Sequence, residues 1–256
     1  MKFEQLELFP GTDKQQQREG FSPLSMRPGE LYTIVGSTGS GKSRLMKDIE
    51  QLANGDSITG RRVFLNGAPL KSRARLEASR ALMAHLGQSM RFVLDTDAIS
   101  FLALHARCRN STCAPERVLA LANQLTSEPI LQRQHLNLLS GGQTRALMVA
   151  DIALICDAPV VLVDEIENAG LDKEAALRAL LRQDKLVLVV THDPHTALMA
   201  EKRIVLENGA IKAVLRRTAE EEQIYQQLGV SYRREQMLRR MLRCGMQLKR
   251  NPLEQE

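Results

Sequence analysis

The chain has 256 residues, of which 43% are hydrophobic and 25% are charged, and its formal net charge is +5. This composition is typical of a soluble globular protein with a full core. No apolar run approaches the roughly 20 residues that span a bilayer, because Asp157 and Pro159 interrupt the longest candidate, residues 153–163.

The first residues, Met1–Leu6, lack the apolar core of a signal peptide. We therefore expect a cytoplasmic chain, free or peripheral at the inner face of the membrane, with any membrane-spanning part on another polypeptide. The four cysteines are then expected to be reduced thiols. His105, Cys108 and Cys113 do not follow a common zinc spacing and have no evident fourth ligand. The favoured interpretation is that they belong to a helical lobe and its loop.

The first half of the chain alternates strand and helix patterns. Residues 2–9 alternate loosely and predict a strand, and the polar stretch 10–20 predicts an exposed loop. Leu31–Val35 is a short β-branched run ending at a glycine, which predicts a buried strand. A helix is predicted over residues 43–52, and a strand over residues 62–65 with a tight turn at Asn66-Gly67.

The second half predicts a helical stretch followed by an α/β core. Residues 89–157 carry leucine and alanine at helical spacing. Residues 160–163 and 186–190 are apolar runs of strand length, as in parallel strands buried on both faces, and residues 173–183 predict a helix between them. Residues 203–206 and 211–214, joined through Asn208-Gly209, predict a closing hairpin.

The character of the chain changes at Thr218, where a capping-box pattern predicts a helix start. Gly229 is expected to interrupt this helix before a second one, which has an apolar side of Met237, Leu238, Met241, Leu242 and Leu248. Residues 231–250 hold seven basic residues against Glu235, a local charge of +6. Three interpretations stay open for this segment: packing on the body, docking of a partner protein, or binding of nucleic acid or anionic lipid.

A glycine-rich loop between the strand at 31–35 and the following helix has the spacing of a phosphate-binding loop. Its glycines let backbone N–H groups point at phosphate oxygens, and the helix N-terminus adds favourable partial charge. Lys42 would reach the β- and γ-phosphates of a nucleotide and Ser43 would bind Mg²⁺. The expected phosphate contacts are Gly36, Ser37, Thr38, Gly39, Ser40, Gly41, Lys42 and Ser43.

Two acidic residues end the apolar strand at 160–163. Asp164 would stand at the carboxyl edge of the sheet, where it can hold Mg²⁺ directly or through water. Glu165 follows and is suited to act as the general base for an attacking water. Downstream of a phosphate loop, this pair is better explained by hydrolysis than by a solvated acidic turn.

The segment Leu139–Gln143, Leu-Ser-Gly-Gly-Gln, would expose a second helix N-terminus that can bind an anion. One nucleotide already has its cradle in the phosphate loop. A second anion site therefore makes sense if it closes on the nucleotide of a partner subunit. A plain serine cap followed by glycines is the alternative for this segment.

With these motifs in this order, the chain resembles the nucleotide-binding domain of the ATP-binding cassette (ABC) family over residues 20–213. The resemblance implies an α/β P-loop NTPase fold with a RecA-like core, an antiparallel β subdomain and a helical subdomain. It implies an ATPase domain over residues 1–213, with the helical subdomain at about 89–157, followed by a basic helical extension over 214–256. Two such domains would close head to tail over two ATP molecules.

Carried over to this chain, the resemblance implies roles for six sites. Gln88 would sense Mg²⁺ and the attacking water, Asp172 would be the D-loop aspartate, and His192 would contact the γ-phosphate. Asp164 and Glu165 would be the Walker B aspartate and the catalytic base. The segment at 139–143 would be the signature, whose nucleotide contacts are Ser140, Gly141, Gly142 and Gln143.

The chain departs from the family pattern at Ile166, where proline is usual, and by one extra residue before Asp172. The adenine-stacking aromatic is not evident, with Phe9 the first choice and Phe3 the second. Three roles for the ATP cycle stay open. They are transport through a separate membrane permease, remodelling or activation of a soluble partner enzyme, and action on nucleic acid through the arginine-rich tail.

Overall fold

The computed structural model describes residues 2–168 and 170–248. Its centre is a six-stranded sheet in the order β5-β6-β7-β3-β8-β9. The strands are β3 (Leu31–Val35), β5 (Met83–Leu86), β6 (Val160–Asp164), β7 (Leu186–Val190), β8 (Lys202–Glu207) and β9 (Ala210–Arg216). Neighbouring strands from β5 to β8 pair in parallel, and β9 closes the sheet as the antiparallel arm of a hairpin with β8.

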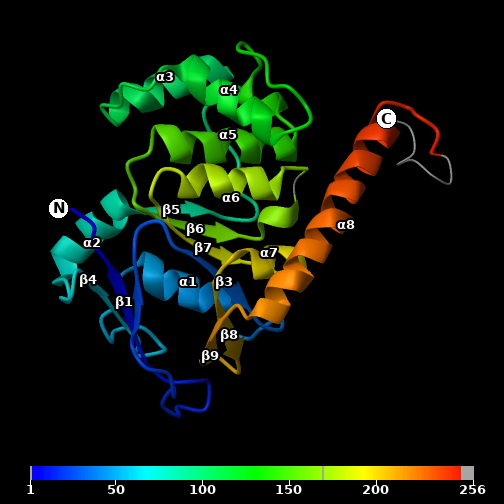
Figure 1. The fold of residues 1–256 in the computed structure, drawn as a ribbon. Helices are drawn as coiled ribbons and strands as arrows, with labels where there is room; N and C mark the ends of the chain where they lie inside the picture. Colours follow the sequence, from blue (N-terminus) through cyan, green and yellow to red (C-terminus); the bar gives the residue numbers. More distant parts are fainter. Residues whose placement is uncertain (1, 169, 249–256) are drawn as a thin grey trace.

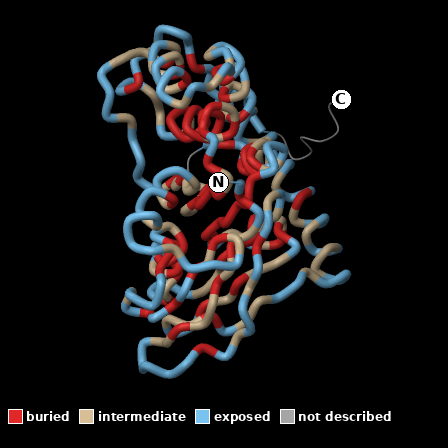
Figure 2. The backbone as a smooth tube through the Cα atoms, turned by 90° about the vertical axis from the view of Figure 1, so that its left-hand side faces the viewer, coloured by how far each residue is buried: buried red, intermediate tan, exposed pale blue. Residues whose placement is uncertain are grey.

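The parallel strands β6 and β7 lie in the middle of the protein, as their apolar sequences predict. Val160–Val163 and every residue of β7 are buried. Figure 2 shows the buried residues concentrated towards the centre of the molecule. Because both faces of these strands are covered, their carboxyl ends form one fixed edge on which functional groups can be mounted.

A second, three-stranded antiparallel sheet has the order β2-β1-β4. Its strands are β1 (Leu6–Phe9), β2 (Leu24–Met26) and β4 (Arg62–Leu65). The predicted strand at 62–65 and its Asn66-Gly67 turn are confirmed, whereas the predicted strand at 2–9 forms only over β1. Arg61 ties this region to helix α1 (Lys42–Glu50), since its buried guanidinium pairs with Glu19 at 2.6 Å and with Asp48 at 3.3 Å.

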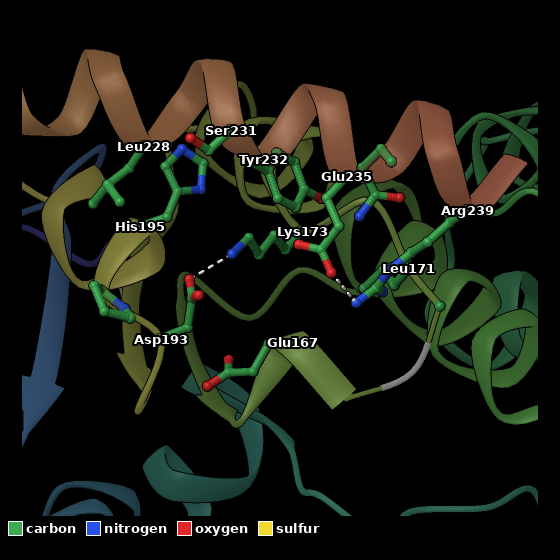
Figure 3. A pocket seen from close by; sticks show the side chains of 13 residues that line it. Glu167, Leu171, Lys173, Asp193, His195, Leu228, Ser231, Tyr232, Glu235 and Arg239 are labelled. Carbon is green, nitrogen blue, oxygen red and sulfur yellow. Dashed lines mark hydrogen bonds and ion pairs between the residues drawn. The ribbon is translucent and has the colours of Figure 1, made fainter. Parts of the chain in front are cut away.

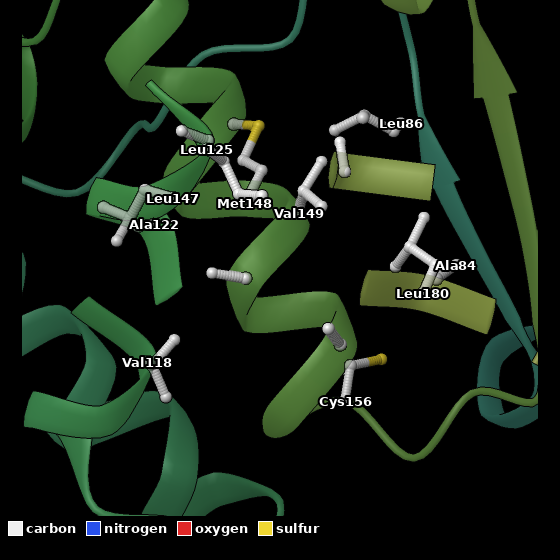
Figure 4. Close-up of a cluster of buried hydrophobic side chains, with 14 of the residues drawn as sticks. Ala84, Leu86, Val118, Ala122, Leu125, Leu147, Met148, Val149, Cys156 and Leu180 are labelled. Atoms are coloured by element: carbon white, nitrogen blue, oxygen red, sulfur yellow. The ribbon is translucent and has the colours of Figure 1, made fainter. Parts of the chain in front are cut away.

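The helical stretch forms a separate layer above the central sheet (Figure 1). It contains α3 (Ala98–Cys108), α4 (Pro115–Leu125), the short η1 (Leu136–Leu138) and α5 (Gly141–Leu154). Leucines and alanines at helical spacing build its interior (Figure 4), where Leu125 and Leu147 are almost fully buried. This core continues to Leu180 on α6 (Lys173–Leu181) and to Leu86 on β5. Helix α2 (Ser72–Leu82) precedes β5.

The prediction that Gly229 interrupts the C-terminal helix is wrong. Helix α8 runs unbroken from Ala219 to Arg243, capped at Thr218 by the predicted capping box. Gly229 is instead buried in the middle of α8. The absence of a side chain there lets the helix approach His195 on α7 (Pro194–Met199). Figure 1 shows α8 lying along one side of the body.

Packing of the apolar side of the C-terminal segment, one of the three open interpretations, is only partial, since Leu238 and Met241 are partly buried. Met237, Leu242 and Leu248 are exposed, and α8 meets α7 through Tyr225 and Tyr232 instead. Lys249 and Arg250 lie outside the described residues. The face of α8 that contacts the body is therefore formed by aromatic residues, whose rings stack on His195, rather than by the methionines and leucines.

Within residues 2–168 and 170–248, no helix has the length and apolar character needed to cross a membrane. The same part of the chain contains no cluster of metal-ligating side chains around His105, Cys108 and Cys113. His105 lies 2.7 Å from Asp151 through Nδ1, and both cysteines are free. His105 and Cys108 lie on α3 and Cys113 lies in the loop before α4, within the predicted helical stretch.

Candidate functional site

The phosphate loop, Gly36–Ser43, connects β3 to α1 as predicted. Gly36 and Gly41 have φ angles of 155° and 103°, and a Cβ on Gly36 would come within 2.4 Å of the carbonyl oxygen of Leu206. Gly41 lies against Gly209 of the β8-β9 hairpin. Only glycine fits these positions. The close backbone approach keeps the loop curled around the first turn of α1, whose N–H groups have no acceptors within the helix.

Lys42 folds back over the phosphate loop. Its Nζ donates to the carbonyl oxygens of Gly36 at 2.8 Å and Ser37 at 3.0 Å. Burial lowers the pKa of Lys42, and the carboxylates of Glu165 and Asp164 oppose that change. Ser40 Oγ is also buried, and it has no hydrogen-bond partner within the described residues. An ammonium group and an unpaired hydroxyl at a helix start suit a polyphosphate, which supplies acceptors to both.

The two acidic residues stand at the carboxyl end of β6. Asp164 pairs in register with Val190 of β7, and the N–H of Glu165 donates to the carbonyl oxygen of Val190 at 3.0 Å. Glu165 has a φ of 49°, which is uncommon for a residue with a side chain. Such strain is kept where surrounding contacts hold the backbone, and it is often found at functional sites. With Ser43 of α1, Asp164 offers the oxygen ligands that Mg²⁺ prefers.

Two residues far away in sequence surround the Glu165 carboxylate. Gln88 Nε2 donates to Glu165 Oε2 at 2.6 Å, and His192 Nε2 lies 3.8 Å from Glu165 Oε1. Gln88 follows β5 and His192 follows β7, so the ends of strands adjacent to β6 supply both. The structure thus brings Gln88, Glu165 and His192, three of the predicted site residues, together.

Arg145 is a site residue that the sequence analysis missed. It lies on α5, is only 5% exposed, and donates to four backbone carbonyls. Its guanidinium contacts Glu165 O at 2.9 Å, Gln88 O at 2.8 Å, Gly87 O at 3.2 Å and Asp164 O at 3.4 Å. Burial lowers its pKa, and the carboxylates of Asp164, Glu167 and Glu165 oppose that change. An arginine inside a buried helical run was the available signal.

The signature segment, Leu139–Gln143, forms the start of α5. Ser140 caps the helix by accepting from the N–H of Gln143, and Gln143 Oε1 accepts from the N–H of Ser140 at 2.9 Å. Gln143 is buried and also donates to the carbonyl of Pro129. Gly141 and Gly142 border an open hollow of about 860 Å³ whose described lining includes Gln88 and Gly170 but no residue of the phosphate loop.

Asp172 caps α6 by accepting from the N–H of Ala175 at 3.1 Å. The hydroxyl of Tyr232 on α8 lies 3.5 Å from its carboxylate. Burial, followed by the charge of Asp172, raises the pKa of Tyr232. Asp172 therefore contacts α8, a link that the sequence did not indicate.

His195, in the first turn of α7, is the centre of the α8 contact. It is 4% exposed and stacks between Tyr225 and Tyr232 at centroid distances of 5.2 and 5.0 Å. Its Nε2 lies 3.1 Å from Glu174 Oε1. Burial lowers the pKa of His195, and the charge of Lys173 adds to this effect.

The two candidate adenine-stacking residues have different surroundings. Phe3 is buried in the core of the β subdomain, which does not suit stacking on a ligand. Phe9 is partly exposed and packs on Phe64 at 4.5 Å, with Arg62 over both rings. Phe9 therefore stays the candidate.

Comparison with known proteins agrees with this arrangement. The ABC transporter family matches residues 22–168. The chain is 43% identical over 226 residues to an uncharacterized ABC transporter ATP-binding protein of Methanocaldococcus jannaschii, covering 88% of this chain and 87% of that protein. It is 32% identical to the phosphonates import ATP-binding protein of Stutzerimonas stutzeri, covering 73% and 75% of the two chains.

Two solved structures share the fold. One is an ATP-binding subunit of an ABC transporter, with a TM-score of 0.65, 21% identity, and coverage of 88% of this chain and 93% of that chain. The other is a dimeric ATP-binding cassette in a post-hydrolysis state with ADP and Pi, with a TM-score of 0.60, 22% identity, and coverage of 82% and 98%. The phosphate loop, the acidic strand end and these relatives together show that the chain belongs to the ABC transporter family and is an ATP-binding cassette ATPase.

Proposed function

We propose that the protein hydrolyses ATP as a dimer to drive transport through a separate membrane permease. The observation that carries this proposal is the position of Gln88. Its side chain contacts the Glu165 carboxylate, and the residues directly after it line an exposed apolar groove. A partner seated in that groove would therefore touch the same segment as the catalytic carboxylate.

The groove has a volume of about 360 Å³ and lies between β5, α3 and α5. Its apolar lining includes Met90, Phe92, Val93, Leu94 and Phe101. Val93 is 97% exposed, and Met90 and Leu94 are about half exposed. Exposed apolar side chains gathered in a groove are typical of a binding surface. A short apolar segment of a permease is the occupant we propose, in keeping with the import protein named among the relatives.

In the hydrolysis site, Lys42 and the N–H groups of the phosphate loop would hold the β- and γ-phosphates. Ser43 and Asp164 would hold Mg²⁺, which neutralises charge that develops on the transferred phosphoryl group. Glu165, oriented by Gln88, would accept the proton of the attacking water. His192, whose Nε2 lies 3.8 Å from Glu165 Oε1, would contact the γ-phosphate.

The dimer is proposed because the signature and the phosphate loop do not share a pocket among the described residues. The N-terminus of α5 can bind an anion only if another molecule brings one to it. A head-to-tail partner would bring its own ATP to Ser140, Gly141 and Gly142, with Gln143 holding the cap and Asp172 at the interface. The dimeric neighbour with ADP and Pi supports this arrangement.

The test is to purify a Glu165→Gln variant from native cells with ATP and Mg²⁺, which should slow release of the bound partner. The membrane fraction should contain the variant together with a polytopic membrane protein. Adding Val93→Glu should abolish that association and leave ATP binding intact. Ile58→Glu serves as the matched control, because Ile58 is 76% exposed but lies outside the groove.

A Val93→Glu variant that keeps its membrane partner would contradict docking in this groove. Co-purification with a soluble enzyme or with nucleic acid alone would contradict the transport role. In that case the second candidate, remodelling of a soluble partner, would be favoured, and the exposed side chains of α8 would be the surface to examine.

A further inference from the structure

Glu167 stands two residues after Glu165 in the short η2 helix (Ile166–Asn168). Its carboxylate reaches the turn that follows β7, here called the switch turn (Thr191–Asp193). Glu167 Oε1 accepts from Thr191 Oγ1 at 2.9 Å and from the backbone N–H of His192 at 3.1 Å. The N–H of Asp193 in turn donates to Thr191 Oγ1 at 3.0 Å.

Two hydrogen bonds to the Glu167 carboxylate, and a third from Asp193 to Thr191, thus hold the switch turn. Thr191 is 1% exposed, so its hydroxyl has little access to water in place of Glu167. Hydrogen bonds to a charged carboxylate are about twice as strong as neutral ones, and those away from water are stronger again. The backbone at His192 therefore depends on Glu167 for its position.

A second tie comes from the start of α6. Lys173 Nζ lies 2.5 Å from the Asp193 carboxylate, which also accepts from the N–H and hydroxyl of Thr196 at 2.7 Å. Figure 3 shows Glu167, Lys173 and Asp193 around one cavity, with α8 closing its upper side. The cavity measures about 230 Å³. Both ties come from the segment that connects the catalytic carboxylate to the D-loop and α6.

The remaining oxygen of Glu167 points to a role beyond packing. Oε2 is buried and has no hydrogen-bond partner within the described residues. Leaving such an acceptor unpaired costs about 1–3 kcal/mol, and an apolar residue at this position would avoid the cost. The segment between β6 and α6 thus carries a carboxylate at a position where one of its two oxygens has no hydrogen bond within the described residues.

We propose that Glu167 is a positioning residue for ATP hydrolysis, which holds the switch turn so that His192 faces the Glu165 carboxylate. The imidazole of His192 is 47% exposed and has few other restraints, and its Nε2 lies 3.8 Å from Glu165 Oε1. Glu167 ties its backbone to the same short segment that carries Glu165. Movement of that segment would therefore move both groups together. This inference rests on the catalytic role proposed for His192.

The test compares steady-state hydrolysis by Glu167→Ala, Glu167→Gln, His192→Ala and the double variant Glu167→Ala/His192→Ala. Glu167→Ala should lower kcat about tenfold with KM for ATP changed less than twofold. Glu167→Gln should restore most of kcat, because its amide oxygen can accept the same two bonds. In the His192→Ala background, Glu167→Ala should have little further effect on kcat, which is the mark of residues acting through each other.

Glu30→Ala is the matched control, since it removes another partly buried carboxylate that holds Lys202 and Tyr32 just before β3, away from the site. It should lower the melting temperature as Glu167→Ala does, without lowering kcat. A Glu167→Ala variant with full kcat beside a slow His192→Ala variant would overturn the inference alone. Additive losses in the double variant would also overturn it. A fully active His192→Ala variant would remove the proposed role of His192, and with it the inference.

Discussion

At the scale of single residues, the site depends on one buried cation that joins three motifs. Arg145 lies on the signature helix, yet its four acceptors belong to the segments around Gln88 and Glu165. Glu165 has a left-handed backbone, so a hydrogen bond to its carbonyl helps to hold a conformation that is costly by itself. A change of position in α5 would thus reach the catalytic carboxylate through Arg145.

Replacement of Arg145 by methionine keeps the length and apolar stem of the side chain but leaves the four carbonyls without this donor. We expect kcat for ATP hydrolysis to fall at least tenfold and the free energy of unfolding to fall by about 2–4 kcal/mol. Arg73→Met is the control, because Arg73 is fully solvated on α2 and pairs only with Glu77. Calorimetry and steady-state kinetics measure the two effects. Unchanged kcat in a folded Arg145→Met protein would contradict the assignment.

At the scale of elements, α8 is held to the body by a stacked set of rings around His195. Tyr225 and Tyr232 enclose the imidazole, and Lys173 Nζ lies 4.5 Å from the centre of the Tyr232 ring. Three further charged groups, Glu174, Asp193 and Arg233, also face this contact. The helix therefore packs directly on residues that follow the switch turn and the D-loop aspartate.

The stability contributed by the α8 contact should depend on pH. The pKa of His195 is lowered in the folded protein, so below its ordinary value of 6.5 the unfolded chain binds more protons than the folded one. This contribution is complete above about pH 6.5 and is lost as the pH falls further. We expect melting temperature to drop more between pH 7.5 and 5 in the wild type than in His195→Phe, which keeps a ring between the tyrosines. Equal pH dependences would contradict a buried neutral His195.

The unbroken helix at Gly229 gives a separate prediction. Gly229 is helical without positive φ, and a Cβ there would meet Arg233 Nη1 at 3.4 Å and His195 Nε2 at 3.7 Å, both ordinary contacts. Since alanine is a better helix former than glycine, Gly229→Ala should stabilise the protein by about 0.5–1 kcal/mol. Denaturant unfolding measures this change. Gly229→Leu, whose larger side chain must push α8 from His195, should destabilise it, and stabilisation by both variants would contradict the close approach.

At the scale of the whole molecule, the proposed ATP site has two halves, the phosphate loop and the start of α5. The phosphate loop and the acidic pair occupy the carboxyl edge of the central sheet, whereas Gly141 and Gly142 open on a hollow that includes no phosphate-loop residue among those described. The proposed function therefore uses a second copy to complete the site. Binding energy from ATP would be used to bring the copies together.

The dimer can be tested without a permease. Glu165→Gln keeps the size of the side chain and its hydrogen bond with Gln88 but cannot take up a proton. With ATP and Mg²⁺ this variant should elute as a dimer on a sizing column, and hydrolysis should fall at least a hundredfold. Adding Gly141→Trp, which blocks the open start of α5, should return it to the monomer position. A monomeric Glu165→Gln protein that binds ATP would contradict the shared site.

Several of these features could be predicted from the sequence because they depend on local patterns. An apolar run of strand length that ends in a glycine loop or in acidic residues can be recognised from neighbouring residues alone. Thr218 caps α8 as its capping-box pattern predicts, and Ser140 caps α5 as a serine before a helix is expected to do. The helix break at Gly229 was predicted by the same kind of rule and was wrong, because close packing against His195 outweighs the low helix propensity of glycine there.

By itself, the sequence determined the family, the phosphate loop, the acidic strand end and the polar residues that follow neighbouring strands, since these are set by short segments. Only the tertiary structure decided what holds them in place: the Arg145 hydrogen bonds, the Glu167 tie to the switch turn, and the α8 contact around His195. These side chains act on partners 19 or more residues away in sequence. Their roles arise from three-dimensional packing, which no local pattern encodes.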